Sequence, residues 1–191
     1  MPRKKPRQRK PSVEHNHLTV EVVSYEADVS AGVNYDAYDP HHALLLDECD
    51  PVYQFSTHVM IKGITTAPKS REGNAFELQI LSEARPSSNL DLMLKDIHKR
   101  NEYEAPEYRP YRGKQIPVYD PPNGVGLIDK VRGKDAWTSW IFVKPGFVSD
   151  ALRLLALDKQ LYLSVHERKE GRSRWVQNVS IQTEAPEAEE G

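Results

Sequence analysis

The sequence has little cysteine and no long apolar run. Cys49 is the single cysteine among 191 residues, which excludes an internal disulfide and any multi-cysteine zinc site. The uninterrupted apolar stretches span only a few residues, far short of the ~20 that a membrane-spanning helix requires. The basic N-terminus is not followed by the apolar segment of a signal peptide. We therefore expect a cytoplasmic protein without a membrane span.

The motifs that would name a reaction are also missing. Neither the HExxH motif of zinc proteases nor the GxSxG motif of serine hydrolases occurs. Gly124 and Gly126 lack the third glycine of a dinucleotide-binding loop. Gly133 and Lys134 are followed by Asp135, where a phosphate-binding loop has Ser or Thr. These absences favour a non-enzymatic role, and we expect no cofactor.

Charge is concentrated at the two ends of the chain. Residues 1–13 hold six basic side chains and no acid, whereas residues 184–191 hold four acids and no base. Neither segment can bury enough apolar area to offset its chain entropy, so both are predicted to be disordered. The basic tail either keeps the protein soluble or contacts the phosphates of nucleic acid. Its six basic residues are Arg3, Lys4, Lys5, Arg7, Arg9 and Lys10.

Apolar and polar residues alternate in several segments, which is typical of β-strands with one buried face. A Pro- and Gly-containing turn between two such segments predicts a hairpin over residues 52–82. A second hairpin is predicted over residues 160–182, turning at Gly171. A strand over 137–143 is apolar on both faces, and we expect Trp140 and Phe142 in the core. The remaining strand covers residues 17–25.

Helical spacing is found in three places. Val148, Ala151, Leu152 and Leu155 form an apolar stripe, which predicts a short helix capped by Ser149 or Asp150. Asp39 and Pro40 predict the start of a second helix over residues 40–49. Residues 90–101 fit either a helix or a strand, and we interpret them as a helix.

These elements predict a mainly β protein with one folded domain over residues 14–183, between the two charged tails. The many strands and turn signals favour a single antiparallel β-sandwich-like domain with two or three short helices.

A segment rich in tyrosine and proline is the first candidate site. Residues 102–123 contain five of the 14 prolines and four of the nine tyrosines. Proline lacks a backbone donor, so we expect this segment to wrap the surface as a loop. Its exposed tyrosines and arginines would suit a protein interface, packing onto the sheet, or stacking with single-stranded nucleic acid. The expected partner-binding residues are Tyr108, Arg109, Tyr111, Arg112 and Tyr119.

A pair of histidines is the second candidate site. His15 and His17 would face the same way if the first strand extends back to them, which suits metal chelation. A third ligand would have to come from elsewhere, for example His58 or His166. The alternative is a pair of exposed histidines at the start of a strand. His41 and His42, by contrast, would point about 100° apart on a helix and are poor partners for one metal.

From these observations the sequence predicts a non-enzymatic binding or scaffolding protein. It would engage a protein partner through the Tyr/Pro-rich segment, with the basic tail as an accessory contact. Two alternatives stay open. One is a metal-dependent enzyme that uses His15 and His17, and the other is a nucleic-acid-associated protein that acts through the basic tail.

Overall fold

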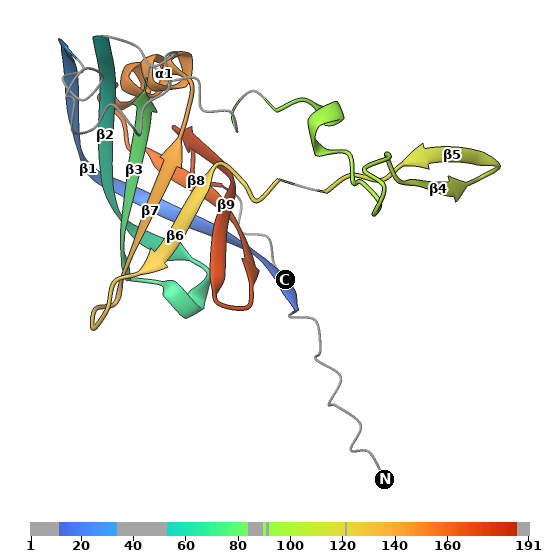
Figure 1. Ribbon diagram of the computed structural model, residues 1–191. Coiled ribbons are helices and arrows are strands. Elements are labelled where there is room, and N and C mark those ends of the chain that lie inside the picture. The colour runs from blue at the N-terminus through green and yellow to red at the C-terminus, as the bar shows by residue number, and fades with distance from the viewer. Residues whose placement is uncertain (1–11, 34–52, 84–89, 91, 121, 187–191) are drawn as a thin grey trace.

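A computed structural model of the protein describes residues 12–33, 53–83, 90, 92–120 and 122–186. Seven strands close into a barrel in the order β1-β2-β3-β7-β6-β9-β8, with β8 returning to β1 (Figure 1). The barrel strands are β1 (Val13–Val33), β2 (Tyr53–Ala67), β3 (Ala75–Glu83), β6 (Gly126–Lys130), β7 (Ala136–Phe142), β8 (Tyr162–Glu170) and β9 (Ser173–Gln182).

The prediction of a mainly β protein is confirmed, but the sandwich is wrong, because one sheet closes on itself. Closure depends on β1, which pairs with β8 through residues 13–21 and with β2 through residues 19–33. Register shifts at Thr19/Val20 and Val22/Ser24 interrupt the pairing with β2, and such bulges bend a strand. The sheet is also not wholly antiparallel, since β3 and β7 run parallel.

Both predicted hairpins are confirmed. β2 pairs antiparallel with β3, and the turn between them contains the short 3-10 helix η3 (Lys69–Arg71). β8 pairs antiparallel with β9, and Gly171 adopts a positive φ of 62° in the tight turn between them. That conformation favours glycine, which explains why the chain reverses at this residue.

A single α-helix, α1 (Pro145–Leu155), occurs within the described residues, and it covers one end of the barrel (Figure 1). Its predicted apolar stripe is confirmed, since Val148, Ala151 and Leu155 are buried. The predicted caps are wrong: the helix begins at Pro145, which has no backbone N–H that would need an acceptor in the first turn.

The other two helix predictions had different outcomes. The described residues of the range 90–101 form no α-helix but the short 3-10 helix η4 (Leu94–Ile97), so that prediction is wrong. The predicted helix over 40–49 lies outside the described residues. Within the part of the chain that the structure describes, no helix is long and apolar enough to cross a membrane.

The barrel interior is filled by the alternating apolar residues of the predicted strands. The buried residues include Leu18, Val20, Val59, Ile61, Phe76, Leu78, Ile80, Leu163 and Val165. The prediction for β7 is wrong about which face of the strand is buried, because Trp137 and Ile141 point inward while Phe142 is 46% exposed. Both faces of this strand are apolar, so the alternation alone does not say which face is inside.

Candidate functional site

The Tyr/Pro-rich segment forms a hairpin of its own outside the barrel. Strands β4 (Tyr108–Tyr111) and β5 (Lys114–Pro117) make a separate two-stranded sheet. Arg112 and Gly113 form its turn, with φ values of 48° and 76° that suit a tight two-residue hairpin. Figure 1 shows this hairpin projecting from the barrel wall. The expected surface-wrapping loop is therefore wrong. A two-stranded ladder tolerates proline because each strand has an open edge.

The hairpin is supported by the residues on either side of it, and we call residues 92–120 the arm. Lys99 N–H donates to Val118 O at 2.9 Å, and Glu107 N–H donates to Lys99 O at 2.8 Å. The Lys99 ammonium lies 2.6 Å from the Glu107 carboxylate, and this contact raises the pKa of Lys99. The rings of His98 and Tyr119 meet in an edge-to-face arrangement with centroids 4.8 Å apart. The arm is thus a small folded unit.

All five residues predicted to bind a partner lie on the arm. Tyr108 and Tyr111 are each 53% exposed, and the Arg112 guanidinium lies 5.3 Å from the centroid of the Tyr111 ring. The hairpin itself, residues 108–117, carries three basic side chains and no acid. It therefore presents aromatic rings and positive charge together. The five residues are Tyr108, Arg109, Tyr111, Arg112 and Tyr119.

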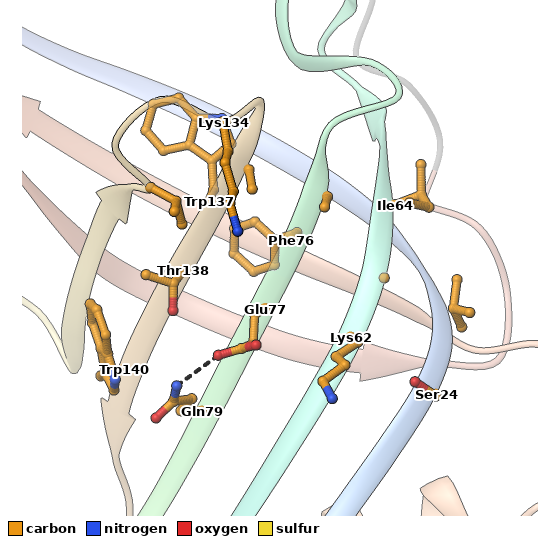
Figure 2. A pocket seen from close by; sticks show the side chains of 15 residues that line it. Ser24, Lys62, Ile64, Phe76, Glu77, Gln79, Lys134, Trp137, Thr138 and Trp140 are labelled. Atoms are coloured by element: carbon orange, nitrogen blue, oxygen red, sulfur yellow. Dashed lines mark hydrogen bonds between the residues drawn. The ribbon is translucent and has the colours of Figure 1, made fainter.

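The outer wall of the barrel carries a groove of about 640 Å³ across β1, β2, β3 and β7, lined by both apolar and polar side chains (Figure 2). Glu77 and Gln79 lie in its centre, and Gln79 Nε2 donates to Glu77 Oε1 at 2.7 Å. Lys62 on the neighbouring strand is 2.6 Å from Glu26, which raises the pKa of Lys62 and lowers that of Glu26. A second cation, Lys134, lines the same groove from the turn between β6 and β7.

A second groove, of about 410 Å³, lies beside the root of the arm, and we call it the aromatic groove. None of its lining residues is charged. Trp175, Leu127 and Trp140 form a cross-strand row through the pairing of β9, β6 and β7. Leu127 is 50% exposed, although it lies in a barrel strand. The groove is lined by Leu90, Pro122, Gly124, Val125, Gly126, Leu127, Trp140, Phe142, Trp175 and Gln177.

The predicted histidine pair meets His166 on the outer wall of the barrel. His15 Nδ1 lies 3.2 Å from His166 Nε2, and the ring of His17 stacks on that of His166 at 4.4 Å with a 6° tilt. A metal is bound in the plane of an imidazole ring, so two parallel stacked rings do not converge on one ion. Within the described residues, no group of three or more His, Cys, Asp or Glu is arranged to hold a metal. Metal binding stays a prediction.

The six basic residues predicted to contact nucleic acid lie outside the described residues. The described chain near them begins at Ser12, and Val13 pairs with Glu170 beside the turn between β8 and β9. These six residues are Arg3, Lys4, Lys5, Arg7, Arg9 and Lys10.

A buried ionic cluster inside the barrel was missed at the sequence level. Glu167 is fully buried, and its carboxylate accepts hydrogen bonds from Arg71 at 2.7 and 3.0 Å. Arg174 donates to the same carboxylate, and Asn16 donates to it at 3.1 Å. The Arg71 guanidinium lies 4.0 Å from the centroid of the Trp137 ring. The alternation along β8 that buries Leu163 and Val165 also places Glu167 inside the barrel. This spacing is the sequence feature from which burial of Glu167 could have been predicted.

The ionic cluster predicts a specific dependence of stability on pH. Burial opposes ionisation of Glu167, but the hydrogen bonds and charge of Arg71 and the charge of Arg174 outweigh it and hold its pKa below the ordinary 4.5. Because the folded pKa is the lower one, this stabilisation is complete above roughly pH 4.5 and is lost as pH falls through the folded pKa. We expect the urea midpoint of the wild type to fall in that range.

Glu167→Gln is the matched variant for this measurement, because a protonated Glu resembles Gln. Its urea midpoint should be lower than that of the wild type at neutral pH, and the two midpoints should converge as the solution becomes acidic. Midpoints that stay equally far apart at every pH would show that ionised Glu167 does not stabilise the fold.

Comparison with known proteins gave no relative. No family model, no curated protein and no solved structure matches this chain. The class that fold and site define is a seven-stranded β-barrel protein with a projecting aromatic arm.

Proposed function

We propose that the protein is a non-enzymatic binding module that engages a protein partner through the arm. The observation that carries this proposal is the exposure of Tyr108 and Tyr111 on a hairpin that stands away from the barrel. Tyrosine and arginine are enriched among the residues that contribute most to binding at protein interfaces. An isolated two-stranded hairpin is only marginally stable in water, so packing against a partner also stabilises the arm.

The charge of the whole arm favours a protein over nucleic acid as the partner. Residues 92–120 contain six basic and five acidic side chains, so the arm has little net charge. The Lys99 ammonium is paired with Glu107. A nucleic-acid surface gains its affinity from cations that neutralise phosphates, whereas protein interfaces combine aromatic rings with limited charge.

We expect replacement of Tyr108, Arg109, Tyr111 and Arg112 by alanine to weaken capture of the protein partner by at least about 10-fold, because residues of these types commonly cost over 1 kcal/mol each when truncated. The measurement is affinity purification of the tagged full chain from its native cells after nuclease treatment. Proteins captured in stoichiometric amount are then quantified by mass spectrometry.

A matched control removes one tyrosine and one arginine far from the arm. Tyr53→Ala with Arg153→Ala changes exposed side chains on β2 and α1, and it should leave capture unchanged. The urea unfolding curve of the barrel should be the same for all three proteins. A partner that is captured equally by the arm variant would rule out the arm as its binding site.

A further inference from the structure

We propose that the groove across β1, β2, β3 and β7, which we call the wall groove, binds a nucleotide. The base stacks on Trp140 and the phosphate lies against Lys134, and both of these residues line the groove. The nucleotide is either free or one unit of a single strand. The site lies on the barrel and not on the arm, so the inference goes beyond the proposed function.

The size and lining of the wall groove suit a small ligand. Its volume of about 640 Å³ falls within the range of roughly 300–1,000 Å³ that ligand sites occupy. Apolar side chains form part of the lining, and a few polar side chains converge on the same space, as in most ligand sites. The polar residues are Ser24, Lys62, Glu77, Gln79, Lys134 and Thr138.

One end of the wall groove offers an aromatic surface beside hydrogen-bonding groups. Trp140 on β7 pairs with Gln79 on β3, and Figure 2 shows the two side chains next to each other. An indole ring binds a flat base by stacking. Gln79 donates to Oε1 of Glu77, so Oε2 of this carboxylate can accept a hydrogen bond from a ring N–H or an amino group. A nucleobase supplies both the flat face and such donors.

The middle of the wall groove contains a hydroxyl group without a partner. Thr138 Oγ1 is buried, and among the described residues it has no hydrogen-bond partner. Buried polar groups are nearly always hydrogen-bonded, so an unpaired hydroxyl in a groove points to a ligand that supplies the partner. Thr138 lies two residues from Trp140 on the same face of β7, about 7 Å along the strand. The sugar of a nucleotide stacked on Trp140 would lie there.

The other end of the wall groove is positively charged. The turn between β6 and β7 carries Lys130, Arg132 and Lys134. Lys130 lies 3.6 Å from Asp135, whereas neither Arg132 nor Lys134 forms an ion pair within the part of the chain that the structure describes. Figure 2 shows the Lys134 side chain extending over Phe76. A phosphate group at this end would pair with the ammonium group of Lys134.

The order of these groups favours a nucleotide over simpler ligands. An inorganic anion would leave Trp140 unused and would be repelled by Glu77, which lies in the centre of the groove. A neutral sugar would leave the cation of Lys134 unpaired. A nucleotide has a flat base, a sugar with hydroxyl groups and a phosphate in the same order as the stacking surface, the unpaired hydroxyl and the cation.

Calorimetric titration of the full chain tests the inference with AMP, GMP, CMP and UMP, with the four matching nucleosides and with inorganic phosphate. At least one nucleotide should bind at least about 5-fold more tightly than its nucleoside, because its phosphate pairs with Lys134. In Lys134→Gln this difference should disappear, since the phosphate then has no partner. Lys95→Gln is the matched control. It removes the same charge from the arm, so the difference should remain.

Two substitutions on β7 test the other contacts. Trp140→Val should weaken nucleotide binding at least about 10-fold, as loss of base stacking does, and valine retains the preference for a strand. Thr138→Val should weaken binding by about 3- to 10-fold through loss of one hydrogen bond. The urea midpoint of Thr138→Val should equal or exceed that of the wild type, because the hydroxyl has no partner in the protein. A merely structural role of Thr138 would lower the midpoint instead.

A five-nucleotide single-stranded RNA that contains the preferred base distinguishes the two sources of the nucleotide. An affinity for the RNA at least about 10-fold above that for the mononucleotide identifies a strand as the ligand, because neighbouring units then add contacts. Equal affinities identify a free nucleotide. The inference is overturned if none of the four nucleotides binds at millimolar concentration, or if both β7 variants bind like the wild type. Capture of a protein by the arm is measured separately, so neither result affects the proposed function.

Discussion

Replacing Glu167 with alanine is expected to lower the free energy of unfolding by about 3–5 kcal/mol, as removal of one partner from a buried ion pair typically does. The carboxylate holds Arg71 and Arg174 together, and Asn16 donates to it as well. Without the carboxylate, two guanidinium groups of like charge remain close together near the Trp137 ring. Urea unfolding followed by tryptophan fluorescence measures the loss.

The structural reason for so large an effect is that the cluster ties three parts of the barrel together. Arg71 comes from the turn between β2 and β3, Glu167 from β8 and Arg174 from β9. The Arg71 side chain is almost completely buried in this contact, although its residue lies in a turn. The loss of Glu167 therefore removes the contact that holds the β2–β3 turn to the barrel, and it also removes the negative charge between the two guanidinium groups.

Glu170→Ala is the matched control, three residues along the same strand. Glu170 accepts a hydrogen bond from Arg168 at 2.9 Å, but its side chain is about one-third exposed. Partly exposed pairs of this kind contribute about 0–1 kcal/mol, so the control should unfold close to the wild type. Equal destabilisation by the two substitutions would show that the buried cluster contributes no more than a surface pair.

The local elements of the fold could be predicted because the signals for them are local. The turn at Gly171 and the alternation on both sides of it are enough to define the hairpin of β8 and β9. The apolar stripe from Val148 to Leu155 similarly defines α1. In each case, residues close in the sequence make the contacts that decide the structure.

Closure of the barrel could not be predicted, because it depends on pairings between distant residues. β1 pairs with β2 and with β8, which lies about 150 positions further along the chain, as the pairing of His17 with His166 shows. The parallel pairing of β3 with β7 requires a connection that includes the arm. The strands of a sandwich and of a barrel show the same alternation of apolar and polar residues. The local pattern therefore does not indicate which strand edges pair.

The residues of the candidate sites, like the fold, could be predicted only in part. Composition alone identified the tyrosines and arginines of the arm, yet the count of prolines suggested a loop where the chain forms a hairpin. The aromatic groove was harder to predict, because β7 is apolar on both faces and its sequence does not indicate which face is exposed. The sequence therefore predicts Trp140 and Phe142 in the core, whereas both line the groove.

Gly126→Ala is expected to destabilise the protein by up to about 3 kcal/mol, because added atoms in a tightly packed site force the backbone apart. A Cβ at this position would lie 2.0 Å from the backbone oxygen of Trp140. Gly126 pairs with Ile141 on one side and Val176 on the other, and only one further pair, Leu127 with Trp175, joins β6 to β9. A shift of Gly126 therefore weakens the seam that closes the barrel.

The same substitution should also disturb the aromatic groove, since Gly126 and Leu127 both line it. Gly146→Ala is the control. A Cβ at Gly146 meets nothing within 4 Å, and alanine in a helix is more stable than glycine by about 0.5–1 kcal/mol. Urea unfolding should thus move in opposite directions for the two variants. If Gly126→Ala unfolds like the wild type, the close approach of β6 to β7 does not limit closure of the barrel. If it unfolds at a lower urea concentration, closure of the barrel depends on this glycine.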